Sequence, residues 1–229
     1  MGKKIAKILF YLLMLIIVLV NGYFIYNYTK DKDKQKTIDE TSSIELVEKE
    51  VKSLEYYKEY YSNDEIIGSL KIEGTQIDTL LVKSTNNEYY LNHSLKKEYD
   101  AIGSIYVDYR VNLNSKQINI YGHNSNVYDV MFKELEKYLN KDYYENHKYI
   151  VIWDGNQYFT YQIFSLQIVT TNYEHMNVNP TDWNKHINIL NKSIYDTGIK
   201  ATGEDNILVL QTCNYSPKNS YLIVIAKKI

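Results

Sequence analysis

The sequence predicts a mainly β fold with peripheral helices, arranged as a β-barrel or a β-sandwich. Three observations predict it. Short runs of β-branched and aromatic residues recur from Ile66 to the C-terminus, and helical periodicity is confined to one segment before them and two insertions between them. The chain of 229 residues, 45% hydrophobic and 24% charged, has room for one domain with its own core. Its formal net charge of -2 favours neither a disordered chain nor a basic nucleic-acid binder.

The N-terminus has the pattern of a membrane anchor. Lys3, Lys4 and Lys7 precede an apolar run, and residues 5–26 would span about 33 Å as a helix, enough to cross a bilayer. No small-residue cleavage site follows the run, so we expect an uncleaved signal anchor. The basic flank places residues 1–4 in the cytoplasm and the rest of the chain outside. Residues 27–40 are polar and charged and are expected to be an extracellular linker, followed by the folded domain at 41–229.

The first element expected in this domain is a helix. A capping-box pattern from Ser42 to Glu45 opens it, and an apolar stripe runs from Val47 through Leu54 to Tyr61. Eight strands are expected after it, at 66–72, 77–82, 104–109, 117–121, 149–153, 158–170, 206–212 and 221–227.

Two helical insertions interrupt the predicted strands, at 128–139 and 181–195. The second places Trp183, Ile187, Leu190 and Ile194 on one face, which we interpret as helix core rather than as the wall of a groove. The chain has no internal repeat and no glycine-rich phosphate loop, so nucleotide chemistry is not expected.

Cys213 is the only cysteine, which excludes an intramolecular disulfide and a multi-cysteine zinc site. We expect no metal and no cofactor. The residue ends an apolar strand and a polar turn follows it, so its thiol would be accessible on a fixed backbone. Two interpretations stay open: a buried cysteine that acts as a small hydrophobic residue, and an exposed nucleophile.

A catalytic thiol needs a histidine or another cation nearby, because its ordinary pKa near 8.5 leaves little thiolate at neutral pH. His123 is the favoured partner, since it also follows a strand, with Gly122 permitting a tight turn and Asn124 offering an amide to orient the ring. The other candidates lie in polar loops or predicted helices and are expected at the surface: His93, His147, His175 and His186.

Four segments of the chain resemble the successive sequence blocks of sortases, in the same order: 63–72, 103–110, 120–124 and 210–213. The run Asp108-Tyr109-Arg110, the run Tyr121-Gly122-His123-Asn124, the ending Thr212-Cys213-Asn214-Tyr215 and the helical segment before the cysteine strand are most similar to class B sortases. The resemblance covers about 44–229.

This resemblance implies an eight-stranded sortase-type β-barrel with an N-terminal helix and a helical insertion before the penultimate strand. It also implies a cysteine transpeptidase of Gram-positive cell surfaces, with Cys213 as nucleophile and His123 as acid and base. Asn124, Thr212 and Tyr215 would contact the substrate.

The implied substrates are surface proteins with a C-terminal sorting motif of the Leu/Asn-Pro-x-Thr-Gly/Asn kind, cleaved after Thr through a thioester. A peptidoglycan amine, from a cross-bridge or a stem peptide, would then accept the protein. The membrane would be contacted through the N-terminal helix, and no nucleic acid would be bound.

One family feature is missing. Sortases carry an arginine on the strand after the cysteine, and the equivalent position here holds Tyr221, or Ser220 if the turn aligns differently. Losing one oxyanion donor costs on the order of 3 kcal/mol, so we expect a slow enzyme or one with a substitute donor. Tyr221, Lys218 and Arg110 are the candidate substitutes, and for Arg110 a structural hydrogen bond is favoured.

Two alternative functions remain open at this point. The domain could bind sorting signals without turning them over, which the missing arginine favours. It could also be a secreted cysteine peptidase, because hydrolysis and transpeptidation share the acyl-enzyme and differ only in the nucleophile that resolves it.

Overall fold

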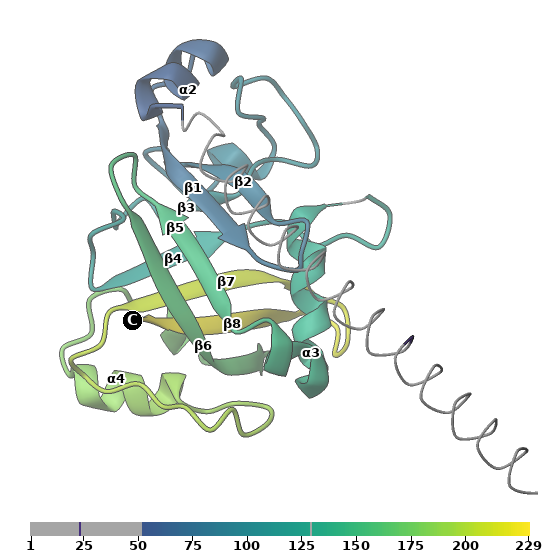
Figure 1. The fold of residues 1–229 in the computed structure, drawn as a ribbon, viewed down its shortest axis with the longest axis vertical. Coiled ribbons are helices and arrows are strands. Elements are labelled where there is room, and N and C mark those ends of the chain that lie inside the picture. The colour runs from purple at the N-terminus through teal and green to yellow at the C-terminus, as the bar shows by residue number, and fades with distance from the viewer. Residues whose placement is uncertain (1–22, 24–51, 129) are drawn as a thin grey trace, which may run out of the picture. The chain divides into compact units, whose positions relative to one another are not determined.

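The computed structural model describes Tyr23, residues 52–128 and residues 130–229 (Figure 1). Apart from Tyr23, the predicted signal anchor at 5–26 lies outside these residues, as do the linker at 27–40 and the predicted helix start at Ser42. Within the described part of the chain, no helix is both long enough and apolar enough to cross a bilayer.

Eight strands close into a barrel, as the sequence predicts (Figure 1). Around the barrel they follow the order β1-β2-β3-β4-β7-β8-β6-β5, and β5 pairs with β1 to complete it. The strands are β1 (Ile66–Ile72), β2 (Asp78–Val82), β3 (Tyr106–Val107), β4 (Gln117–Tyr121), β5 (Tyr149–Trp153), β6 (Tyr158–Val169), β7 (Ile207–Asn214) and β8 (Ser220–Lys228).

The strand boundaries differ from the expected ones at two functionally relevant places. β3 forms only a two-residue ladder instead of covering 104–109. β7 runs to Asn214 and β8 begins at Ser220, because Cys213 pairs with Tyr221 and Asn214 with Ser220. Cys213 therefore lies inside the β7–β8 ladder rather than after it.

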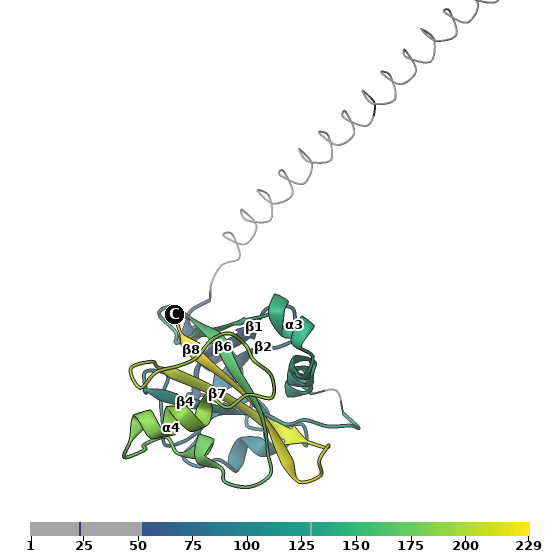
Figure 2. The same cartoon turned by 90° about the horizontal axis from the view of Figure 1, so that it is seen from below.

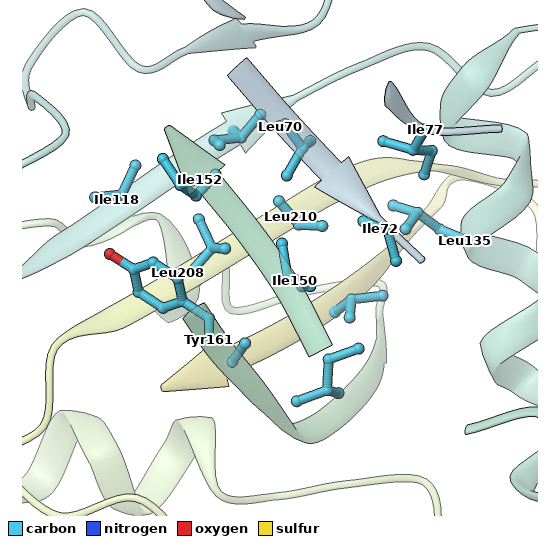
Figure 3. Close-up of a cluster of buried hydrophobic side chains, with 14 of the residues drawn as sticks. Leu70, Ile72, Ile77, Ile118, Leu135, Ile150, Ile152, Tyr161, Leu208 and Leu210 are labelled. Carbon is cyan, nitrogen blue, oxygen red and sulfur yellow. The ribbon is translucent and has the colours of Figure 1, made fainter. Parts of the chain in front are cut away.

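Alternating apolar residues explain the barrel core. Leu70 and Ile72 of β1, Ile150 of β5, and Leu208 and Leu210 of β7 are fully or almost fully buried and belong to one cluster inside the barrel (Figure 3). The first part of β7 is apolar on both faces. Its outward residues Ile207 and Val209 are also buried, whereas the outward residues of a solvent-exposed strand are usually polar.

The cover comes from α4 (Trp183–Leu190), within the second predicted insertion (Figure 2). The Asp182 carboxylate accepts a hydrogen bond from the Lys185 amide and caps its start. Ile187 and Leu190 pack against the outward residues of β6, β7 and β8. Ile194 was expected on the same face, but the helix ends before it and the residue is 45% exposed.

The N-terminal helix is shorter than predicted. α2 (Leu54–Tyr61) begins after Ser53, whose extended backbone and hydroxyl, which accepts from the Tyr56 amide, form the N-cap. A single helix from Ser42 to Tyr61 is therefore wrong. Ser62, in the left-handed conformation, ends the helix.

The first insertion is not the α-helix that the sequence pattern predicts. It forms the 3₁₀-helix η2 (Met131–Leu139) and then α3 (Lys141–Asn146), which the pattern missed. Asn140 separates the two because its backbone is extended and its side chain caps the Asp142 amide. The remaining short 3₁₀-helices are η1 (Tyr89–Leu91) and η3 (Glu174–Met176).

Candidate active site

The parallel pairing of β4 with β7 brings the predicted nucleophile and base together. The ladder runs from Gln117 opposite Ile207 to Tyr121 opposite Gln211. Two bonds continue it: the Gly122 amide donates to the Gln211 carbonyl at 3.3 Å, and the Thr212 hydroxyl donates to the Gly122 carbonyl at 2.8 Å. The next pair in this register is His123 with Cys213.

Side chains two residues apart in a strand share a face, and paired residues of neighbouring strands share it too. Ile118, Ile120, Leu208 and Leu210 point into the barrel. The residues between them point outward, so the outer surface of β3, β4, β7 and β8 carries a common set of side chains. We call this surface the active-site face; at its end lie Tyr106, Tyr121, His123, Cys213 and Tyr221.

The hydrogen bond of His123 fixes its tautomer. Nε2 lies 2.7 Å from the carbonyl oxygen of Leu91, the last residue of η1. A carbonyl can only accept, so Nε2 carries the proton and Nδ1 is the basic nitrogen of the neutral ring. The ring can therefore take up a proton on Nδ1 without losing this contact.

Gly122 sets the chain direction just before His123. A Cβ atom at this position would lie 2.7 Å from the Phe132 ring and 3.2 Å from Ile105. Only glycine lets the strand end pass this close to η2. This close approach, and not the tight turn expected from the sequence, explains the glycine, because Gly122 is not among the glycines of the described residues that have a positive φ.

Cys213 is a free, exposed cysteine. Partial burial nevertheless raises the pKa of its thiol. The thiol is therefore the main form at neutral pH, and nucleophilic attack requires a base to remove its proton.

Asn124 ties the two strand ends to each other. Its Nδ2 donates to the Cys213 carbonyl at 2.9 Å and to Glu136 Oε1 at 2.6 Å, and the Tyr215 hydroxyl donates to the Asn124 carbonyl at 2.9 Å. Together with the bond from Thr212 to Gly122, these contacts clamp the turn after β7 onto the segment after β4. The three residues predicted to bind substrate thus use the Asn124 Nδ2 and the Thr212 and Tyr215 hydroxyls to hold the two strand ends together, while Asn124 Oδ1 is buried without a partner among the described residues.

Tyr221 lies directly opposite Cys213 in the β7–β8 ladder, at the position expected for the family arginine. Its half-buried ring makes an edge-to-face contact with Tyr173, with 5.6 Å between centroids. Ser220 instead pairs with Asn214, is buried, and donates its hydroxyl to the Pro217 carbonyl at 2.6 Å. Lys218 is exposed on the turn.

Arg110 is held in a structural ion pair, as the sequence favours. Its guanidinium donates to both carboxylate oxygens of Asp108, at 2.9 and 2.7 Å, and to the Met176 carbonyl at 3.0 Å. Tyr121 and Asn87 also donate to Asp108. Arg110 is therefore engaged by Asp108, and its bond to the Met176 carbonyl links the segment after β3 to η3.

His175 and His186 are buried, so the expectation that they lie at the surface is wrong. His175 Nε2 lies 2.7 Å from Gln211 Oε1, and His186 Nε2 lies 2.7 Å from Gln117 Oε1. Burial lowers the pKa of both rings. The sequence signal that could have found them is the row of polar residues at the outward positions of β4 and β7, including Asn119, in otherwise apolar strands.

A cavity of about 480 Å³ opens beside His123. The loop from Ser94 to Ile105 and the segment from Val130 to Phe132 line most of it. Across the described residues, no group of three or more histidine, cysteine or acidic side chains is placed to hold a metal ion.

Comparison with known proteins agrees with this geometry. A model described as the Sortase domain matches residues 70–229. Sortase B of Staphylococcus aureus is 30% identical over 239 residues, which covers 95% of this chain and 94% of that protein. The chain belongs to the sortase family. Sortase B of Listeria monocytogenes is 34% identical over 159 residues, 66% of this sortase, and the match spans 64% of the Listeria protein, less than two thirds of its length.

Solved structures give the same result. Sortase B of Clostridium perfringens is 30% identical, with a TM-score of 0.69, over 76% of this sortase and 98% of that chain. Sortase B of Listeria monocytogenes is 28% identical, with a TM-score of 0.67, over 75% and 98% of the two chains. The chain is thus a sortase of class B type, a cysteine transpeptidase built on the eight-stranded barrel.

Proposed function

We propose that this sortase cleaves a C-terminal sorting motif of the Leu/Asn-Pro-x-Thr-Gly/Asn kind after its Thr and transfers the protein to a peptidoglycan amine, with Cys213 and His123 as the catalytic pair. The β4–β7 register carries the proposal, because it sets His123 beside an exposed Cys213. No other histidine of the described residues stands at the end of a strand that pairs with the cysteine strand.

The first step forms a thioester. His123 Nδ1 accepts the thiol proton, the thiolate attacks the Thr carbonyl carbon, and a carbon–sulfur bond forms as the carbonyl π electrons move to oxygen. When the carbonyl re-forms, the carbon–nitrogen bond breaks, and the imidazolium protonates the departing amine. Because Nε2 is bound to the Leu91 carbonyl, Nδ1 is the nitrogen that first accepts the thiol proton and then donates it to the leaving amine.

The second step releases the product. An acceptor amine attacks the thioester carbonyl, His123 takes its proton, and the carbon–sulfur bond breaks to regenerate Cys213. The cavity that His123 helps to line, and that Tyr221 does not, is the proposed entry site of the acceptor. Water in place of the amine would give hydrolysis instead.

Tyr221 replaces the family arginine as a hydrogen-bond donor at the developing oxyanion. Its position opposite Cys213 supports this role, whereas Ser220 and Arg110 are engaged elsewhere. A neutral phenol binds an oxyanion more weakly than a guanidinium does, so the proposed enzyme acylates slowly.

The chain also carries the sequence pattern of a surface location. We propose that residues 1–4 are cytoplasmic, that residues 5–26 anchor the protein in the membrane, and that residues 27–40 tether the domain outside. Its partners would then be surface proteins with a sorting motif, and peptidoglycan. Proteolysis of intact cells tests this: an external protease should release the domain, and an intracellular domain would stay protected.

The decisive test is the mass of the purified chain after incubation with a panel of sorting-motif peptides. We expect a covalent adduct or a cleaved peptide with wild-type protein, neither with Cys213→Ala, and a strongly reduced yield with His123→Ala. Adding an amine separates transfer from hydrolysis, because a transpeptidase makes the amide product and a peptidase makes only the free acid.

The missing arginine favours a second candidate, a sorting-signal-binding module without turnover. Intact peptides across the panel, together with a saturable fluorescence-anisotropy signal for one of them, would support this candidate and contradict the transpeptidase.

A further inference from the structure

The Tyr106 side chain has a packed ring but a hydroxyl without a hydrogen-bond partner in the described part of the chain. It lies on β3 opposite Tyr121, and its ring is packed against that residue, with 5.4 Å between centroids and only 5% of the residue exposed. The Tyr121 hydroxyl donates to Asp108 at 2.8 Å. The Tyr106 hydroxyl, by contrast, makes no hydrogen bond to the described residues.

The same hydroxyl is not sealed inside the protein. In the described part of the chain, the one side-chain atom that is both fully buried and without a partner is Asn124 Oδ1. The Tyr106 ring is thus buried while its oxygen reaches the surface unpaired. The packed ring fixes the position of the hydroxyl. Because this hydroxyl has no protein partner among the described residues, it is available to bind a ligand.

The tip lies on the active-site face. Tyr106, Tyr121 and Gln211 stand side by side across β3, β4 and β7, and Cys213 is two residues beyond Gln211 on the same face. Burial is the main reason why the pKa of Tyr106 is raised. The negative charges of Asp108, Cys213 and Tyr221 raise this pKa further, so these groups are close enough to the phenol to act on it. A raised pKa keeps the phenol protonated, and so a donor, at neutral pH.

We propose that Tyr106 is a second oxyanion donor, which acts with Tyr221 to replace the arginine that this sortase lacks. The proposal rests on the proposed transpeptidase function. Two neutral donors from β3 and β8 approach the reacting carbonyl from opposite sides of Cys213, where a guanidinium would supply two N–H groups from one side chain.

The phenols stabilise charge without losing their protons. As the Cys213 sulfur bonds to the carbonyl carbon, the π electron pair moves to the oxygen, and both hydroxyls donate hydrogen bonds to it. When the carbonyl re-forms, these bonds weaken, the carbon–nitrogen bond breaks, and the proton of the leaving amine comes from His123.

The test uses single-turnover acylation by a sorting-motif peptide that wild type cleaves, measured by mass on the full chain purified in mild detergent. The variants are Tyr106→Phe, Tyr221→Phe, and Tyr106→Phe combined with Tyr221→Arg. Tyr158→Phe is the matched control, since it removes an exposed phenol from the start of β6.

We expect Tyr106→Phe to acylate about tenfold to a hundredfold more slowly, with an unchanged melting temperature because no protein hydrogen bond is lost. Tyr221→Arg should restore most of the rate in the Tyr106→Phe background, and Tyr158→Phe should behave as wild type. If Tyr106→Phe also melts earlier, Tyr221→Arg alone is compared with the double variant. A smaller slowing by Tyr106→Phe in the Tyr221→Arg background than in wild type supports the donor role, and an equal slowing in both backgrounds overturns it.

A wild-type acylation rate in Tyr106→Phe would overturn the inference and leave the proposed function intact. Absence of any Cys213-dependent adduct in the wild-type protein would instead overturn the proposed function itself. The two failures are therefore distinguishable in one experiment.

Discussion

The buried carboxylate of Asp108 allows a quantitative prediction. Burial alone would raise its pKa, but the hydrogen bonds from Arg110, Tyr121 and Asn87 outweigh it and lower the pKa from 3.8 to about 2. The difference corresponds to about 2–3 kcal/mol of unfolding free energy at neutral pH, since one pH unit is worth about 1.4 kcal/mol. We expect Asp108→Asn to lose about this amount.

The pH dependence follows from the sign of this pKa change. A carboxyl group with a lowered folded-state pKa stabilises the protein above its unfolded-state pKa and loses that effect as pH falls through the folded-state value. The contribution of Asp108 should thus be complete above about pH 5, reduced by about 1 kcal/mol at pH 3, and mostly lost near pH 2. Other acidic groups titrate in the same range, so the informative quantity is the difference between wild type and Asp108→Asn.

Urea denaturation of both proteins from pH 7 to pH 2.5 measures this difference. Asp78→Asn is the control, because Asp78 forms an exposed ion pair with Lys71 and its removal should leave the midpoint almost unchanged. A wild-type-like midpoint for Asp108→Asn at pH 7, or a difference that stays constant down to pH 2.5, would refute the reasoning.

Three further predictions concern the proposed catalytic pair and its surroundings. Gly122→Ala should destabilise the fold by about 1–3 kcal/mol, because the added methyl meets the Phe132 ring; thermal melting checks this. The lowered pKa values of His175 and His186 mean that the unfolded chain binds more protons than the folded chain, so stability should fall from pH 7 to pH 5. The melting temperature of a variant with both His175→Asn and His186→Asn should depend less on pH over this range. Alkylation of Cys213 by iodoacetamide should rise with pH to a midpoint above that of a free thiol, since burial raises the Cys213 pKa; a midpoint at or below that of a model thiol contradicts it.

Local sequence patterns were sufficient for most of the barrel. Strands such as β1, β4 and β5 coincide with their predicted ranges, because their alternating or continuous apolar residues lie next to clear turn residues. The helices were less predictable, since Ser53 and Asn140 interrupt the periodic pattern with caps that compete with helix continuation.

The sequence by itself determined the strand content, the lone cysteine and the favoured histidine, each from residues within a few positions of one another. Only the tertiary structure decided what surrounds them. The β4–β7 pairing joins segments far apart in the chain, the β3–β4 pairing adds Tyr106, and a hydrogen bond joins Gln211 to the buried His175 near the proposed catalytic pair. Pairing and register depend on how separate strands bury their shared core, so no local pattern contains them.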